Sequence, residues 1–164
     1  LMGAGKSTVG RRLASALSLE FIDSDHEIAE AAGCSISDIF EIYGEAMFRD
    51  LEKRVLMRLL SSPPRVIATG GGAFMNSDIR GAIKDKALSI WLRAELNILV
   101  ERVSRRDTRP LLKTGDKNEI LKRLMDDRYP IYSEADITID SSHGPHDTVV
   151  NDIMEALDKR ARHG

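Results

Sequence analysis

The chain has 164 residues, of which 42% are hydrophobic and 30% are charged, and its formal net charge is −2 at pH 7. This length suits one globular domain with its own core, and the slightly acidic balance argues against a general nucleic-acid binder, which is usually strongly basic. The single cysteine, Cys34, excludes an internal disulfide and suits a reducing compartment. No apolar run approaches the roughly 18 residues that a membrane span needs. We therefore expect a cytoplasmic monomer that binds neither nucleic acid nor membrane.

Hydrophobic periodicity and turn signals predict alternating helices and strands. The first half is expected to contain a helix to about residue 18, a strand over 19–23, helices over 24–32 and 35–43, and a longer helix that ends before Pro63. The second half is expected to contain a strand over 65–69, a helix from about 76, a strand over 87–92, a helix near 96–103, a polar loop over 106–117, a helix over 118–128, a strand over 136–140 and a terminal helix. This alternation predicts a single α/β domain over 1–164, with a parallel sheet covered on both faces.

The chain opens inside a phosphate-binding loop. Gly3-Ala4-Gly5-Lys6-Ser7-Thr8 matches the second half of the G-x-x-x-x-G-K-[ST] pattern and leads into an amphipathic helix. In such a loop the backbone N–H groups bind phosphate, Lys6 adds positive charge, and the Ser7 hydroxyl binds Mg²⁺. ATP and Mg²⁺ are therefore the expected cofactors, and the alternative is an ordinary glycine-rich turn before a helix.

The loop pattern also bears on the start of the chain. The first glycine of the pattern would precede Leu1, and so would the strand that normally feeds such a loop. We expect the natural chain to extend upstream by at least one strand.

Two polar segments follow predicted strands at the edge where open α/β sheets bind ligands. In Asp23-Ser24-Asp25, one carboxylate could hold magnesium through water and the other could orient an attacking hydroxyl, while the alternative is helix capping by Ser24 or Asp25. The Gly70-Gly71-Gly72 turn ends another strand, and three glycines permit both close approach of a ligand and positive φ angles. Together they predict an acceptor site at this edge.

Several arginines are candidates for binding anions. Arg49 is either a substrate ligand or half of a surface pair with Glu45, four residues before it. Arg128 is either a helix-end cation or a second ligand for an anionic substrate. Positive charge at a helix C-terminus explains Arg102, Arg105 and Arg106 but not Arg109, which stands beyond the predicted helix end. An arginine on a closing loop stabilises the charge that develops in phosphoryl transfer.

The whole set of motifs resembles the shikimate kinase family. The matching pieces, in chain order, are GAGKST at 3–8, DSD at 23–25, FR at 48–49 with Glu52, GGG at 70–72, RPLL at 109–112 and RYPIY at 128–132. The resemblance implies a P-loop NTPase fold like that of the nucleoside monophosphate kinases. Such a fold has three layers, a parallel five-stranded sheet whose first strand is missing here, a mobile lid at about 106–117 and substrate-binding helices at about 24–60.

The resemblance also implies an activity, which is transfer of the γ-phosphoryl group of ATP to the 3-hydroxyl of shikimate. The products would be shikimate 3-phosphate and ADP, on the route to chorismate and the aromatic amino acids. Shikimate is accordingly the expected small-molecule partner.

Residue roles follow from the same resemblance, motif by motif. Residues that bind the nucleotide would be Gly3, Ala4, Gly5, Lys6, Ser7, Thr8, Arg106 and Arg109, with Arg105 as the alternative to Arg106 for stacking on adenine. Metal ligands would be Ser7 and, through water, Asp23, which replaces the aspartate missing from the RVIATGGG strand. Residues that bind shikimate would be Asp25, Arg49, Gly70, Gly71, Gly72 and Arg128. Catalytic residues would be Lys6, Asp25 as proton acceptor, and Arg109.

Two alternatives remain open at this point. The first is a kinase of similar fold that acts on gluconate or a nucleoside monophosphate, and the pairing of Arg49 with Arg128 beside three glycines favours a carboxylated ring over these. The second is an idle P-loop module that binds nucleotide and regulates a partner. The joint presence of Lys6, Ser7, Asp25 and Arg109 argues against such a module.

Overall fold

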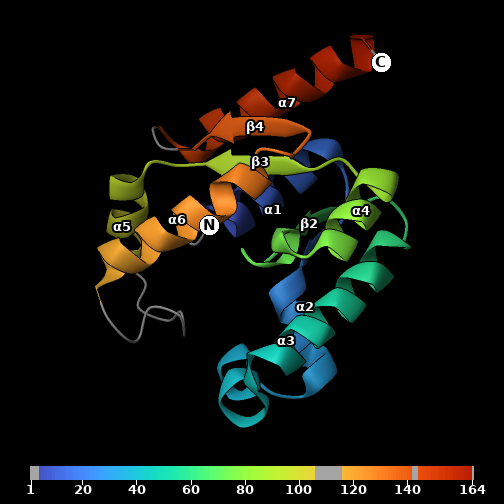
Figure 1. Ribbon diagram of the computed structural model, residues 1–164. Helices are drawn as coiled ribbons and strands as arrows, with labels where there is room; N and C mark the ends of the chain where they lie inside the picture. Colours follow the sequence, from blue (N-terminus) through green and yellow to red (C-terminus); the bar gives the residue numbers. More distant parts are fainter. Residues whose placement is uncertain (1–3, 106–115, 142–143, 164) are drawn as a thin grey trace.

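The computed structural model describes residues 4–105, 116–141 and 144–163. Helices and strands alternate along them in the order α1 (Lys6–Leu17), β1 (Phe21–Asp23), α2 (Ser24–Ala32), α3 (Ile36–Leu60), β2 (Val66–Ala68), η1 (Ala73–Met75), α4 (Ser77–Lys86), β3 (Ile90–Arg93), α5 (Leu96–Ser104), α6 (Lys117–Tyr132), β4 (Ile137–Asp140) and α7 (His146–His163) (Figure 1). This order confirms the expected α/β class. No helix within these residues has the length and apolar character that a membrane crossing requires.

The strands are parallel, as predicted, and form two pairs. β1 pairs with β2, with Asp23 opposite Ala68, and β3 pairs with β4, with Ile90 opposite Ile137. No strand pairing joins the two pairs among the described residues. An apolar groove of about 420 Å³ lies along α1 and is lined by both β2 and β3.

Each strand pair has its own hydrophobic core. Helices α1, α5, α6 and α7 pack against β3 through buried side chains that include Val9, Leu92, Leu99, Leu121 and Ile153. The helices α2, α3 and α4 pack against β1 through Ile22, Ile28, Ile39, Leu56 and Ile79. Figure 1 shows the result, with β3, β4 and α7 at one end of the molecule and α2 with the first half of α3 at the other. The two clusters adjoin at α1, because Gly10 of this helix contacts Phe21 of β1 and Val66 of β2 packs against the first cluster.

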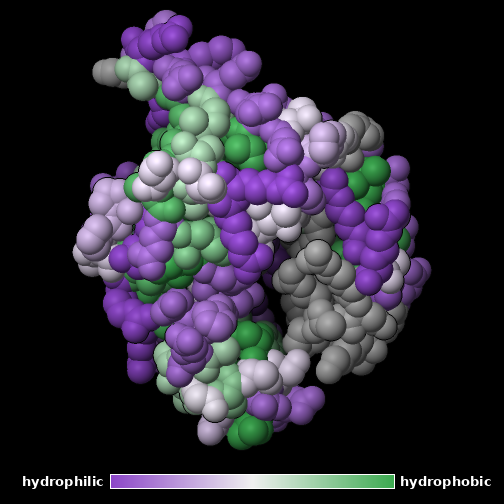
Figure 2. All heavy atoms as spheres, turned by 180° about the vertical axis from the view of Figure 1, so that it is seen from behind, coloured by the Kyte–Doolittle hydropathy of each residue, from purple (hydrophilic) through white to green (hydrophobic). Residues whose placement is uncertain are grey.

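The helix predicted over 35–43 and the longer one after it form the single element α3, which is interrupted at Gly44 (φ 84°, ψ 170°). Glycine adopts this backbone conformation without steric cost. The predicted boundary between the two helices is therefore present as non-helical backbone at Gly44. The first half of α3 leaves Ile42, Tyr43 and Met47 exposed. Figure 2 shows apolar atoms among polar ones at this end of the molecule.

Two other predicted boundaries are wrong. β3 starts at Ile90, three residues later than expected. α6 continues past Pro130 to Tyr132, instead of ending at 128, because a proline inside a helix removes one backbone hydrogen bond without preventing the next turn. Arg128 therefore lies within the last turn and a half of α6. Except for Asp116 and Lys117, which begin α6, the predicted lid at 106–117 lies outside the described residues.

The contact between Gly10 of α1 and Phe21 of β1 generates a stability prediction. A Cβ atom added at Gly10 would lie 2.7 Å from Cε2 of Phe21. We expect Gly10→Ala to lower the free energy of unfolding by about 1–3 kcal/mol in urea titrations, because the ring must move out of the helix–strand contact. Gly81→Ala on α4 is the matched control, because an added Cβ meets no atom within 4 Å there. The control should gain about 0.5–1 kcal/mol from helix propensity, and equal effects would contradict the packing argument.

Candidate active site

The phosphate loop leads directly into α1. Gly5 has a left-handed backbone (φ 87°, ψ 21°), which glycine adopts readily, and Lys6 begins the helix. The N-cap makes no side-chain hydrogen bond, and the first turn contains no acidic residue. The N–H groups of this turn, together with the positive end of the helix dipole, are therefore available to an anion. Gly3 lies outside the described residues.

Asp23 connects the phosphate loop to α2. The Ser7 hydroxyl donates to Oδ2 of Asp23 at 3.0 Å, and the backbone N–H of Asp25 donates to Oδ1 at 2.9 Å. The expectation that Ser24 or Asp25 caps α2 is therefore wrong, because Asp23 is the N-cap. Its extended backbone (φ −97°, ψ 118°) places its carboxylate over the N–H two residues on. Asp25 contributes its backbone N–H to this cap.

The two predicted magnesium ligands are next to each other at this point. No cluster of three or more histidine, cysteine or acidic side chains that could hold a metal ion occurs in the described part of the chain. One hydroxyl and one carboxylate beside an anion-binding loop suit Mg²⁺, which keeps several waters and takes its other ligands from substrate phosphates. The residues present therefore fit a magnesium ion shared with a bound triphosphate.

The glycine turn after β2 passes against charged side chains. A Cβ atom at Gly70 would lie 3.0 Å from Oδ1 of Asp25 and 3.3 Å from Oε2 of Glu52, and one at Gly72 would overlap the guanidinium of Arg49. None of the three glycines has a positive φ, so that part of the prediction is wrong. A side chain at Gly70 would crowd Asp25 and Glu52, and one at Gly72 would displace the guanidinium of Arg49.

Arg49 is held by two glutamates of its own helix. Its Nη1 lies 3.0 Å from Oε1 of Glu52, and its Nη2 lies 3.4 Å from Oε1 of Glu45. The surface pair with Glu45 therefore exists, but the shorter contact is with Glu52, whose residue is only 1% exposed. Arg49 is thus turned from the helix surface toward the interior.

Four charged side chains form one electrostatic cluster, which we call the charged cluster: Asp25, Arg49, Glu52 and Arg128. Burial raises the pKa of Glu52, and the charge and hydrogen bond of Arg49 oppose this shift. The charge of Asp25 raises the same pKa and the charge of Arg128 lowers it, so all four groups interact at short range. Arg128 is itself 8% exposed, which excludes the interpretation as an exposed helix-end cation.

The carbonyl groups of the glycine turn point into the protein. Those of Gly70 and Gly72 accept hydrogen bonds from the N–H groups of Ala73 and Met75, both at 3.2 Å, and that of Gly71 accepts one from the Tyr132 hydroxyl. No described residue accepts a hydrogen bond from the N–H of Gly71 or Gly72. Backbone N–H donors and arginines are both groups that bind small anions.

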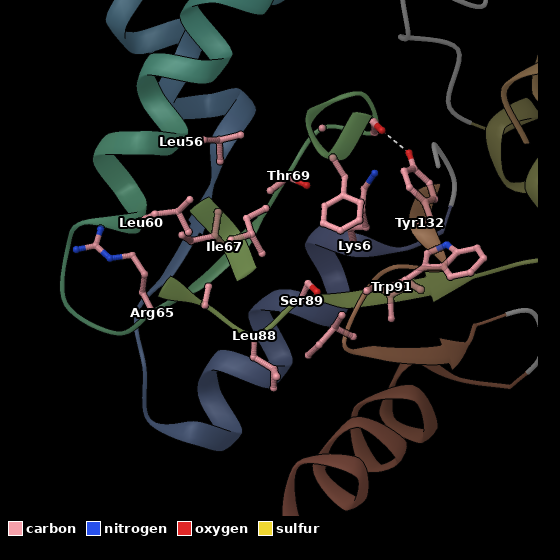
Figure 3. A pocket seen from close by; sticks show the side chains of 18 residues that line it. Lys6, Leu56, Leu60, Arg65, Ile67, Thr69, Leu88, Ser89, Trp91 and Tyr132 are labelled. Carbon is pink, nitrogen blue, oxygen red and sulfur yellow. Dashed lines mark hydrogen bonds between the residues drawn. The ribbon is translucent and has the colours of Figure 1, made fainter. Parts of the chain in front are cut away.

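The groove on the other side of the turn contains Lys6. This part of the groove has a volume of about 180 Å³, and its wall includes Lys6, Thr69, Gly71 and Tyr132. Figure 3 shows Lys6 and Tyr132 lining the same end of it. The phosphate loop and the glycine turn are therefore neighbours, as the sequence predicts.

The structure does not bring together all of the predicted residues. Arg106 and Arg109 lie outside the described residues, so their assignments stay predictions. Two site residues were not assigned a role from the sequence, Glu52 and Tyr132. Glu52 stands between Phe48 and Val55 at helical spacing, so an acidic residue on an apolar stripe was a usable signal. Tyr132 belongs to the RYPIY motif, but its contact with Gly71 is 61 residues away in sequence and has no local signature.

The chain matches known proteins over nearly its whole length. The family model described as shikimate kinase matches residues 2–158. A shikimate kinase of Paramagnetospirillum magneticum is 55% identical over 157 residues, which cover 96% of this chain and 80% of that protein. A shikimate kinase of Rhodopseudomonas palustris is 54% identical over the same length and covers 77% of that protein.

The fold is similar to those of solved kinase structures. The structure of shikimate kinase from Acinetobacter baumannii in complex with shikimate has a TM-score of 0.93 at 38% identity, covering 97% of this chain and 89% of that one. A gluconokinase from Sinorhizobium meliloti has a TM-score of 0.63 at 18% identity and covers 99% and 90% of the two chains. The second likeness concerns the fold alone.

Proposed function

Because the chain belongs to the shikimate kinase family, we propose that it transfers the γ-phosphoryl group of ATP to the 3-hydroxyl of shikimate. The products are shikimate 3-phosphate and ADP, in the biosynthesis of chorismate and the aromatic amino acids. The observation that carries the proposal is the convergence of Arg49, Arg128 and the N–H groups of the glycine turn beside Asp25.

The phosphate loop binds the nucleotide. The N–H groups at the start of α1 receive the phosphates, Lys6 supplies a positive charge, and Ala4, Gly5 and Thr8 complete the loop. Ser7 and Asp23 would hold Mg²⁺, which supplies charge neutralisation at the phosphate oxygens when bound. Phosphoryl transfer requires mainly positioning and electrostatic stabilisation, and both are provided by groups on rigid elements.

The charged cluster binds the acceptor. A carboxylate is matched by planar guanidinium groups and backbone N–H donors, so Arg49, Arg128 and the glycine turn fix the carboxylate of shikimate. Fixing one end of a rigid ring also fixes its hydroxyl groups. Asp25 lies in the first turn of α2 beside Gly70, and this position supports a contact between its carboxylate and a ring hydroxyl. We assign it as the acceptor of the hydroxyl proton as the O–P bond forms.

The finer assignments rest on the same arrangement. A monomer is proposed as the active form. The single cysteine and the use of ATP suit the cytoplasm. Arg106 and Arg109 are proposed as nucleotide-binding residues, with Arg109 also stabilising charge on the transferred group.

Acceptor choice tests the proposed function directly. ADP release by the purified protein should depend on shikimate, and gluconate or nucleoside monophosphates should give no stimulation, because they do not present a carboxylate on a rigid ring. Coupled measurement of ADP with each acceptor at equal concentration checks this. Stimulation by gluconate without stimulation by shikimate would overturn the proposal.

Arg49→Ala tests the binding of the carboxylate. We expect the KM for shikimate to rise roughly 10- to 100-fold, as for loss of a charge-assisted hydrogen bond, while the KM for ATP changes less than about twofold. Arg54→Ala is the matched control, since Arg54 is an exposed arginine of the same helix paired only with Asp50 at 2.7 Å in the described structure. Equal loss of affinity for both substrates would make Arg49 a structural residue.

Asp25→Asn tests proton acceptance. The amide keeps the shape of the carboxylate but cannot take up the proton, so we expect kcat to fall by about 10²- to 10⁴-fold. ATP binding, measured by calorimetric titration, should remain within about twofold of the original because Asp25 does not cap α2. Turnover close to that of the unmodified protein would remove Asp25 from this role.

A further inference from the structure

Tyr132 joins elements that lie on opposite sides of the groove. Its hydroxyl donates to the carbonyl of Gly71, in the turn that follows β2 (Figure 3). Its ring packs edge-on against that of Trp91 of β3, with 5.8 Å between the ring centres, and its ring centre lies 6.4 Å from that of Phe74 of η1. One side chain of α6 therefore links the glycine turn and η1 to β3.

The hydroxyl acts on one particular carbonyl. The Gly70 and Gly72 carbonyls are held by backbone N–H groups of the next turn, whereas that of Gly71 is held by a side chain from a distant helix. A trans peptide is planar, with its C=O and the following N–H pointing in opposite directions. Fixing the Gly71 carbonyl therefore also fixes the direction of the Gly72 N–H, one of the two donors that no described residue engages.

The same side chain is linked to the arginines. Tyr132 lies one helical turn after Arg128 on α6, so the two side chains are neighbours on one face of the helix. Burial raises the pKa of the Tyr132 hydroxyl, while Arg128 lowers it through its charge and a side-chain hydrogen bond. The net shift is upward, so the hydroxyl keeps its proton at neutral pH and remains a donor.

We propose that Tyr132 is a positioning residue for the acceptor site, which sets the direction of the Gly72 N–H and its placement relative to Arg128. The inference deepens the proposed function and rests on it, since the ligand of these donors is taken to be the shikimate carboxylate. Tyr132 itself makes no contact with the reacting atoms. It acts through Gly71 and Arg128, and its ring serves packing while its hydroxyl serves substrate affinity.

Tyr132→Phe separates the two parts of the side chain, because it removes the hydroxyl and keeps the ring. Tyr129→Phe is the matched control on the same helix, where the hydroxyl donates at 2.6 Å to the carbonyl of Ala94 and the ring lies 4.8 Å from Trp91. Both variants lose one buried tyrosine hydrogen bond to a backbone carbonyl. Only one of those carbonyls belongs to the glycine turn.

The measurements are the KM for each substrate, the dissociation constant of shikimate by calorimetric titration, and the midpoint of thermal unfolding. For Tyr132→Phe we expect the KM and dissociation constant of shikimate to rise about five- to thirty-fold, as when one buried acceptor loses its donor, with the KM for ATP within about twofold. For Tyr129→Phe we expect both shikimate constants within about twofold of the original, with a similar fall in the unfolding midpoint.

Each other outcome contradicts the inference. Equal shikimate constants in the two variants, a parallel rise in the KM for ATP, or loss of the folded state in Tyr132→Phe alone would make the hydroxyl a general structural group. The unmodified protein separates this result from failure of the proposed function. If it neither binds nor phosphorylates shikimate, the proposed function fails, whereas normal activity with an unselective Tyr132→Phe defect overturns the positioning role alone.

Discussion

Glu52 is almost fully buried, and a buried carboxylate is stable in its ionised form only when cations and hydrogen bonds replace the lost water. Arg49 supplies both at 3.0 Å, and Arg128 adds a second positive charge from α6. Removing either arginine would leave a buried charge without full compensation. Neutralisation of Glu52 therefore favours a position beside it both for Arg49 of the same helix and for Arg128 of α6. Both arginines then lie near the glycine turn.

A second carboxylate has a comparable double role at the phosphate loop. Asp23 caps α2 with one oxygen and accepts from Ser7 with the other. The helix that begins with this cap carries Asp25. Asp23 therefore contacts both the nucleotide side and the acceptor side of the site. Reorienting Asp23 would disturb both sides together. This coupling suits a reaction in which two substrates must meet in one geometry.

Much of this was predictable from the sequence, because the informative residues are local in their effects. The phosphate loop and the alternation of strands and helices follow from short motifs. The anion-binding roles of Arg49 and the glycine turn stay predictions that rest on the family resemblance. The errors arose partly from local backbone geometry and partly from tertiary contacts. Asp23 caps α2 because of its backbone conformation, α6 continues past Pro130, and the glycines serve close packing instead of positive φ. The hydrogen bond between Tyr132 and Gly71 joins residues 61 positions apart, and no periodic sequence pattern predicts it.

The packing of Arg49 has a thermodynamic consequence for recognition. Its guanidinium lies against Gly72, 5.1 Å from the centre of the Phe48 ring, and within reach of two glutamates. A free arginine side chain loses about 2 kcal/mol of rotamer entropy when it is immobilised. Here folding has already ordered the side chain, so this entropy loss does not recur when the substrate binds. The affinity of the site for a carboxylate thus depends partly on disorder removed before any ligand is present.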